Sequence, residues 1–447
     1  MTLALDLTAP LPAHWLLVFL VQVTVLLLGA RVLGGLAVRL GLPALAGELL
    51  AGVLLGPSVL AHVAPGVWGW LFPAEGGQVH LLDAVGQFGV LLLVGLAGMH
   101  VDVGRLRRLA GPAAKISLAG LLIPLALGVG IGAIAPPPMR PEGTSPAIFA
   151  MFVGVAICVT AVPVIAKVLM ELGLTDRRIG QLVLSAAVID DVIAWFLLSL
   201  VSALVTAGAL GVSDVLEPVG CLAGVVLFAA TIGRMLVRRA VRHAEASRDS
   251  TAMVSTTVIL VLGGAAATHA MGLEPILGAF VAGVLIGSGG VRAPVLAPLH
   301  AVVMSVLAPL FFATAGLRMD LSGLLRPGVL LATTGRVLLA VPGKLAGAFV
   351  GGRLSGLDRA ECIALGAGMN ARGVVEVIIA TVGLSLGVLG TEAYTALVLV
   401  AVVTSVMAPP ILRRAVGRSD RAAAEEPGAR PAESRSGAGT VSLEEPR

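Results

Sequence analysis

The stretch LSAAVIDDVIAWFLLSLVSALV occupies residues 184–205 and carries two adjacent carboxyl groups, Asp190 and Asp191, in an otherwise almost wholly apolar run. About 20 such residues suffice to cross a bilayer as a helix. A charge at the bilayer centre costs about 2.5–3.5 kcal/mol on insertion scales, so such residues are functional candidates. The stretch therefore predicts a membrane-spanning helix with an ion or proton site near its middle.

The composition of the whole chain agrees with a membrane protein. Of its 447 residues, 57% are hydrophobic and 13% are charged, whereas soluble domains carry about 25% charged residues. Glycine occurs 57 times, which suits the close packing of membrane helices. The three cysteines, Cys158, Cys221 and Cys362, lack metal-ligand spacing and are interpreted as small core residues. We expect no cofactor and no enzymatic site.

Thirteen membrane spans are predicted when Gly, Pro and charge clusters are taken as boundaries. The sequence thus predicts an all-α polytopic membrane protein. The predicted spans are residues 14–38, 43–63, 80–99, 112–134, 147–171, 176–206, 214–237, 250–270, 273–289, 295–316, 327–352, 359–387 and 391–412.

Lysine and arginine are distributed unequally between the two sides that these spans define. Among those at span ends and in loops up to residue 414, nineteen lie on the side reached after the first span, and three (Arg140, Arg318 and Arg326) lie on the other. Because cytoplasmic loops are rich in Lys and Arg, we expect an outside N-terminus, a cytoplasmic C-terminus and a plasma-membrane location. This sidedness also explains the net charge of +4 without nucleic-acid binding.

Three parts of the chain are distinguished by composition. Residues 1–13 are expected to be a short extracytoplasmic N-terminus, and residues 14–414 to form the membrane domain. Residues 415–447 are polar and rich in Pro, Gly and Ser, which predicts a disordered cytoplasmic tail.

Further charges within the predicted spans are candidate partners of the aspartates. Lys344 is the only lysine well inside a span, and a buried ammonium needs an opposite charge. It could form a structural tie with one aspartate, which would leave the second carboxyl group unexplained. Arg372 and Glu376 are four residues apart, so they are either a self-neutralising pair or direct participants in transport.

Two adjacent carboxyl groups on a helix point about 100° apart, so one can face a fixed counter-charge and the other a water-filled cavity. Burial and a neighbouring carboxylate both favour the protonated form of a carboxyl group. Such a group can hold a proton near neutral pH and release it to a cation. Competition of H⁺ and a small cation for one carboxylate is the minimum requirement of an antiporter.

Two spans have breaks in their helical pattern. The fifth contains CVTAVPVIAKV (158–168), in which Pro163 removes a helix hydrogen bond next to Thr160 and Ala161. The twelfth contains ALGAGMNARGVVEV (364–377), with Asn370 among glycines. Interrupted helices supply backbone carbonyls and helix ends to transporter sites. When the first span is omitted, the remaining twelve spans divide into two halves of six. The first break then lies in the fourth span of its half and the second break in the fifth span of its half. An internal repeat therefore stays a hypothesis at this point.

These motifs resemble the monovalent cation:proton antiporter-2 family, which includes Kef-type and related bacterial sodium/proton antiporters. The resemblance covers residues 14–412. It rests on GELLAGVLLGPSVL (47–60), TAVPVIAKVLMELGL (160–174), VIDDVIAW (188–195), EPILGAFVAGVLIG (274–287), PLFFATAGLRMDL (309–321), GKLAGAFVGGRLSGL (343–357) and GMNARGVVEVIIA (368–380).

The resemblance implies a fold of thirteen helices with two broken helices that cross near the aspartates, a core domain that moves against dimerisation helices, and a homodimer. It also implies that Asp191 binds Na⁺, K⁺ or H⁺, that Asp190 pairs with Lys344, and that Thr160 supports the site from the break. Paired aspartates are associated with electrogenic exchange of two protons per sodium. Potassium-efflux members often carry a nucleotide-binding domain, and no fingerprint for one follows residue 412.

The sequence therefore predicts a monovalent cation/proton antiporter that works by alternating access, with Na⁺/H⁺ exchange favoured and K⁺/H⁺ exchange of the Kef type as the alternative. Two other classes of membrane protein share part of this pattern. An intramembrane aspartyl protease also needs two membrane carboxyl groups, but it takes them from separate helices. A cation channel would need a selectivity filter, and none is recognisable.

Overall fold

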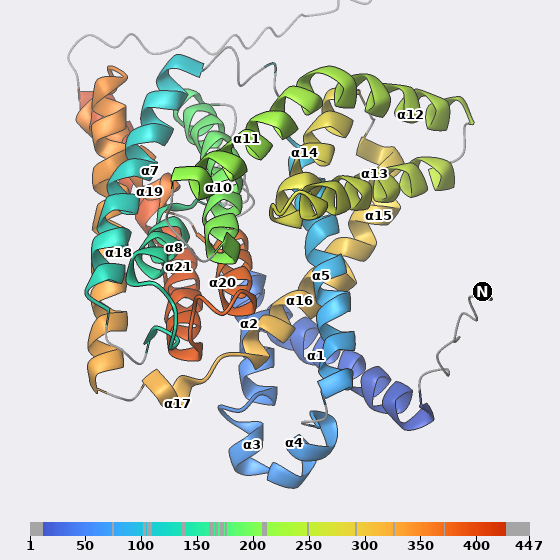
Figure 1. Cartoon of the computed structure of the whole chain (residues 1–447). Helices are drawn as coiled ribbons and strands as arrows, with labels where there is room; N and C mark the ends of the chain where they lie inside the picture. The colour runs from blue at the N-terminus through green and yellow to red at the C-terminus, as the bar shows by residue number, and fades with distance from the viewer. Residues whose placement is uncertain are drawn as a thin grey trace, which may run out of the picture.

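The computed structural model describes residues 12–73, 76–101, 104, 110–135, 139–160, 165, 169, 174, 177–207, 212–247, 250–290, 293–324, 327–370 and 372–425. Within these ranges every regular element is a helix (Figure 1). The helices are α1 (Ala13–Arg39), α2 (Ala44–Leu55), α3 (Leu60–Val63), α4 (Pro65–Leu71), α5 (Gly76–Met99), α7 (Ala110–Ala133), α8 (Pro146–Cys158), α10 (Arg178–Ala207), α11 (Val212–Phe228), α12 (Arg234–Ala246), α13 (Ser250–Ala270), α14 (Pro275–Ser288), α15 (Ala297–Val302), α16 (Ala308–Leu317), α17 (Leu321–Leu324), α18 (Pro327–Leu354), α19 (Arg359–Met369), α20 (Val374–Ser385) and α21 (Thr391–Glu425).

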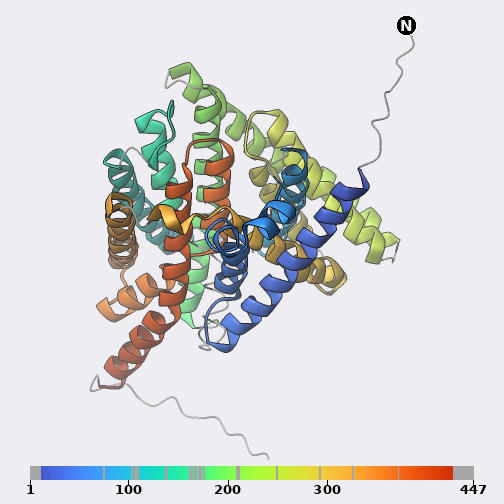
Figure 2. The same ribbon diagram turned by 90° about the horizontal axis from the view of Figure 1, so that it is seen from below.

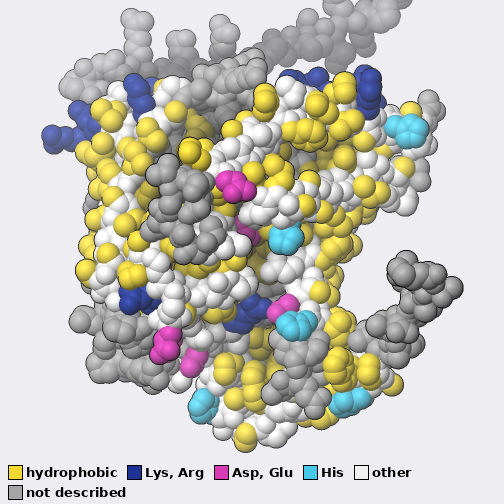
Figure 3. Space-filling view, in the orientation of Figure 1, with side chains coloured by type: hydrophobic (Ala, Val, Ile, Leu, Met, Phe, Trp, Pro, Cys, Tyr) yellow, Lys and Arg dark blue, Asp and Glu magenta, His cyan; other side chains and the backbone are white. Residues whose placement is uncertain are grey.

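Each of the thirteen predicted spans contains a helix. In the described part of the chain, nine helical segments are long and apolar enough to cross a membrane, and the bent pair α19–α20 makes a tenth. Two shorter apolar helices, α8 and α14, occupy the fifth and ninth predicted spans. Hydrophobic side chains cover much of the surface in Figure 3, as expected for a protein with lipid around it. The exact number of crossings stays a prediction.

The helices form two groups. In one, α7 packs against α18 and α8, while α19 packs against α18 and α21. In the other, α1 packs on α2, α2 on α16, α5 on α14, and α13 on α14. Figures 1 and 2 place the α7–α18 group on the left and the α5–α14 group on the right in both views. Contacts between the groups are sparse and involve α10, α14, α16 and α20.

The helix pairs show an internal repeat once the seventh predicted span, rather than the first, is set aside. The contact of α2 with α16 then corresponds to that of α14 with α5, and α7–α8 corresponds to α18–α19. Both breaks fall in the fifth helix of their half. Counting from the first span missed this match because it left the connector α11–α12 inside a half. Such repeats are common in secondary transporters.

Glycines allow the close approach of α7 and α18. A Cβ atom on Gly347 would lie 2.6 Å from the Ala119 carbonyl oxygen, and one on Gly351 would lie 2.6 Å from the Cα of Ile116. Small residues at such contacts let membrane helices pack backbone to backbone. Because Lys344 is one turn from Gly347 on α18, this contact also fixes the height of the lysine in the protein.

Gly347→Leu is expected to lower stability by about 1–3 kcal/mol, the usual range for overpacking a tight core. The matched control is Gly335→Leu on the same helix, where an added Cβ meets nothing within 4 Å. Thermal unfolding of both purified variants in detergent is the measurement. Equal melting temperatures would show that the α7–α18 approach is not tight.

The C-terminal end departs from the sequence prediction. The predicted disordered tail began at residue 415, but α21 continues to Glu425. The segment RAAAE at 421–425 consists of strong helix formers, so the last helix extends past its apolar part. The rest of the predicted tail lies outside the described residues, as do residues 1–11 of the predicted N-terminus.

Candidate ion site at the crossing of two broken helices

The two aspartates lie on α10, twelve and thirteen residues after its start at Arg178. Both are buried: Asp190 is 0% exposed and Asp191 is 7% exposed. As the helical geometry predicts, the two side chains meet different surroundings. The sequence prediction of a carboxyl pair inside a spanning helix is therefore confirmed by the fold.

Asp190 is held by a buried ion pair with Lys344 of α18. The Lys344 Nζ lies 2.8 Å from Asp190 Oδ2, and both side chains are 0% exposed. The same ammonium donates to the carbonyl oxygen of Cys158 at 2.7 Å. Cys158 is the last residue of α8, so the ammonium also neutralises the negative end of that helix dipole.

Two hydroxyl groups complete the surroundings of Asp190. Thr160 Oγ1 donates to Asp190 Oδ2 at 2.7 Å, and Ser117 Oγ of α7 donates to Asp190 Oδ1 at 2.5 Å. Thr160, expected to support the site, therefore contacts the paired carboxyl group Asp190 and not Asp191, the group expected to bind the ion. Ser117 was missed because a serine within an apolar span is common and gives no signal of its own.

Asp191 has no such support. Its Oδ1 atom is buried and makes no hydrogen bond. Buried polar atoms without a partner are rare in native proteins, and each calls for an explanation such as a catalytic or ion-binding role. The contrast with Asp190 agrees with the roles implied by the family resemblance, with Asp190 paired to Lys344 and Asp191 left available.

The two breaks in the helices lie next to each other. In the fifth span α8 ends at Cys158, and Val159 is extended, with φ −75° and ψ 152°. In the twelfth span α19 and α20 are bent by 46° across a break of four residues. Thr160 Oγ1 also lies 3.4 Å from the carbonyl oxygen of Met369, the last residue of α19. Ala161 and Pro163, predicted to take part in the first break, lie outside the described residues.

Asn370, in the second break, is 0% exposed, and neither its side-chain oxygen nor its nitrogen has a hydrogen-bond partner. It directly follows Met369, whose carbonyl faces Thr160. The break therefore places an unpartnered amide beside the Asp190 cluster. An amide oxygen is a suitable ligand for a hard cation.

Arg372 and Glu376 form the predicted pair, with Nη1 and Oε1 3.5 Å apart, and both are buried. Arg372 Nη2 also donates to the carbonyl oxygen of Ala340 at 3.2 Å, one turn before Lys344 on α18. The arginine thus ties the break to the helix that carries the lysine. This contact supports a structural role for Arg372, whereas both carboxylate oxygens of Glu376 are buried without a hydrogen-bond partner, so a transport role for Glu376 stays a prediction.

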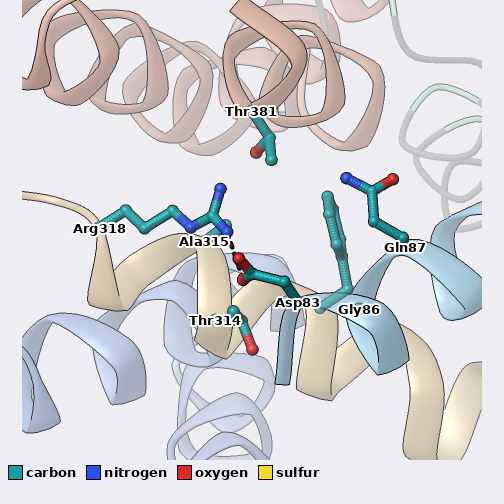
Figure 4. A pocket seen from close by; sticks show the side chains of 8 residues that line it. Asp83, Gly86, Gln87, Thr314, Ala315, Arg318 and Thr381 are labelled. Atoms are coloured by element: carbon teal, nitrogen blue, oxygen red, sulfur yellow. Dashed lines mark hydrogen bonds and ion pairs between the residues drawn. The ribbon is translucent and has the colours of Figure 1, made fainter. Parts of the chain in front are cut away.

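A small pocket lies away from the aspartates, between α5, α16 and α20 (Figure 4). It contains the ion pair of Asp83 and Arg318, and Thr381 of α20 faces it from the other helix group. Sequence analysis assigned no role to these residues. The pocket marks one place where the two helix groups meet.

Known proteins provide a comparison for this geometry. The family model "Sodium/hydrogen exchanger, transmembrane" matches residues 4–416. The chain is 31% identical to the Na⁺/H⁺-K⁺ antiporter GerN of Bacillus cereus, over 90% of this chain and 98% of that protein. It is 30% identical to the Na⁺/H⁺ antiporter NhaS4 of Synechocystis, over 89% of this chain and 97% of that protein.

A solved structure shares the fold. The sodium/proton antiporter MjNhaP1 of Methanocaldococcus jannaschii superposes with a TM-score of 0.64 at 15% sequence identity, covering 91% of this chain and 98% of that one. With the family match over most of the chain, the buried aspartate pair and the two adjacent breaks have a consistent context. The chain belongs to the sodium/hydrogen exchanger family of membrane transporters.

Proposed function

We propose that this protein exchanges Na⁺ for H⁺ across the plasma membrane, with Asp191 as the carboxyl group that binds the two ions in turn. The observation that carries the proposal is the unequal treatment of two adjacent aspartates. Asp190 has an ammonium and two hydroxyl groups, whereas Asp191 Oδ1 is buried with no partner. A buried carboxyl group without a partner is available to a proton or a cation.

In the proposed cycle, ionised Asp191 binds Na⁺ from the cytoplasm, together with oxygen ligands from the breaks such as the Asn370 amide. The α7–α18 group then moves relative to the α5–α14 group and presents the site to the outside. Na⁺ leaves, H⁺ binds Asp191, and the neutral site returns. Asp190 stays paired with Lys344, so one carboxyl charge is neutralised by protein and the other by the transported ion.

Several features of the cellular arrangement belong to the same proposal. The Lys and Arg distribution supports an outside N-terminus and a cytoplasmic C-terminus. Two subunits would hold their α5–α14 groups together as a fixed frame, which an elevator-like movement needs. Exchange of this kind requires no cofactor, and its physiological use would be the control of internal pH and sodium.

Na⁺ is preferred over K⁺ as the substrate. NhaS4 is named for Na⁺ and H⁺ alone, and GerN for Na⁺, H⁺ and K⁺. Membership of a transporter family removes the aspartyl protease alternative, because the chain is not an enzyme. A passive cation channel is distinguished by experiment, since its flux would not respond to a proton gradient.

The test is exchange in proteoliposomes that carry a pH-sensitive dye and an imposed proton gradient. Addition of Na⁺ is expected to dissipate the gradient, Li⁺ to do so in part, and K⁺ to do so least. Because H⁺ and Na⁺ compete for the Asp191 carboxylate, the apparent KM for Na⁺ should fall as the pH rises. The expected fall is up to about tenfold for each pH unit while Asp191 is mostly protonated. Equal dissipation by all three ions, or Na⁺ flux that ignores the gradient, would contradict the proposal.

A further inference from the structure

A half-buried carboxyl group, Glu274, lies where the two helix groups meet. It immediately precedes α14 and is the N-cap residue, yet its side chain makes no capping hydrogen bond. The carboxyl group instead lies beside the Ser202 hydroxyl of α10, with His269 of α13 nearby. Ser202 is 3% exposed, and its Oγ atom has no hydrogen-bond partner. No ion pair of Glu274 is present in the described part of the chain.

Glu274, at the start of α14, lies against the face of α10 that also carries Asp191. Asp191, Trp195 and Ser202 are spaced by four and seven residues, which puts them on one side of the helix. Ser202 is eleven residues from Asp191, or about 16 Å along the axis. The face is therefore a polar–aromatic–polar stripe that runs from the ion site toward the end of α10.

The aromatic part of this stripe is in contact with the opposite helix group. The ring centroids of Trp195 and Phe280 of α14 are 6.3 Å apart. Phe280 is six residues after Glu274, or about 9 Å along α14. Because α10 and α14 run in opposite directions here, the aromatic pair lies between Asp191 and Glu274.

The rest of α14 offers no competing group. Its sequence, PILGAFVAGVLIGS, contains no ionisable side chain, so Glu274 is the only carboxyl group that this helix and its cap residue present to α10. By the positive-inside distribution, this end of α10 is the external one. Glu274 thus lies on the external side of the Trp195–Phe280 pair, and Asp191 lies on its cytoplasmic side.

We propose that Glu274 is an external ion site of the transporter, which accepts H⁺ from outside and receives Na⁺ on its way out. The Trp195–Phe280 contact separates it from Asp191 in this state, and movement between the helix groups removes the separation. Proton transfer is a relay: Glu274 gains H⁺ from external water and, once the aromatic contact has opened, loses it through intervening water to ionised Asp191. The inference rests on the proposed function.

The test is sided transport by the full chain with Glu274→Gln. Radioactive sodium flux is measured in right-side-out and everted membrane vesicles while the pH on each side is varied separately. In the variant, the external pH at half-maximal exchange is expected to move by half a unit or more toward acid, because entry then needs more external protons. The cytoplasmic Na⁺ KM should stay within twofold of wild type.

The matched control is Glu217→Gln on α11, an exposed carboxyl group, which should leave both dependences unchanged. Glu274→Asp should restore the wild-type external midpoint. If Glu274→Gln does not accumulate in membranes, Ser202→Ala tests the same site by removing the neighbouring hydroxyl, and it too should shift the external midpoint. An unshifted external midpoint, or equal shifts on both sides, overturns the inference. Absence of Na⁺/H⁺ exchange in wild type would instead overturn the proposed function.

Discussion

Asp191→Asn is expected to abolish Na⁺-dependent proton movement while leaving the fold intact. An amide cannot ionise, so it can neither bind Na⁺ with a full charge nor carry the proton. The substitution keeps the size of the side chain and removes a buried carboxyl group that has an unpartnered oxygen. Because a buried ionisable group with no partner opposes folding, the melting temperature should stay the same or rise.

The contrast with Asp190→Asn makes this result specific. That variant leaves Lys344 buried without its counter-charge, although the Cys158 carbonyl still accepts from it. Removing one partner of a buried pair typically destabilises by about 3–5 kcal/mol. Dye-based exchange and thermal unfolding on both purified variants separate the cases. Full exchange by Asp191→Asn, or a large loss of its stability, would reject Asp191 as the exchangeable site.

The aspartate site shows which part of the chemistry is visible in sequence. Charges inside a membrane are costly. This holds both for the carboxyl pair in one apolar run and for the single lysine deep in another, so the sequence alone indicates that the lysine pairs with an aspartate. The third contributor to the cluster, Ser117, is an ordinary residue in an apolar stretch. It becomes informative only when α7 is seen beside α10.

Backbone groups and pairing between helices were harder to predict. The Cys158 carbonyl oxygen can accept a hydrogen bond from Lys344 because α8 ends at this residue. No residue type near position 158 indicates that the helix ends there. Thr160 sits in the predicted break, yet its choice of Asp190 over Asp191 depends on the rotation of α10. The repeat was hidden for a similar reason, since counting spans cannot tell which one is the connector.

Lys344→Met is expected to give the largest loss of stability, about 3–5 kcal/mol, because it leaves Asp190 buried with no opposite charge. Lys115→Met is the matched control: this lysine is exposed, and its long 3.4 Å contact with the Leu354 carbonyl is at the surface. Its loss should change stability by no more than about 0.5 kcal/mol. Thermal and denaturant unfolding in detergent measure the difference.

The double variant Asp190→Asn with Lys344→Met decides why the lysine matters. Replacing both members of a buried ion pair by neutral groups is often nearly neutral, and an amide oxygen can still accept from Ser117 and Thr160. Most of the lost stability should therefore return. Because Asp191 is untouched, part of the Na⁺-dependent exchange should return with it, as expected if Lys344 serves as the counter-charge of Asp190. A double variant no more stable than Lys344→Met would mean that the lysine stabilises the protein through the end of α8 rather than through the aspartate.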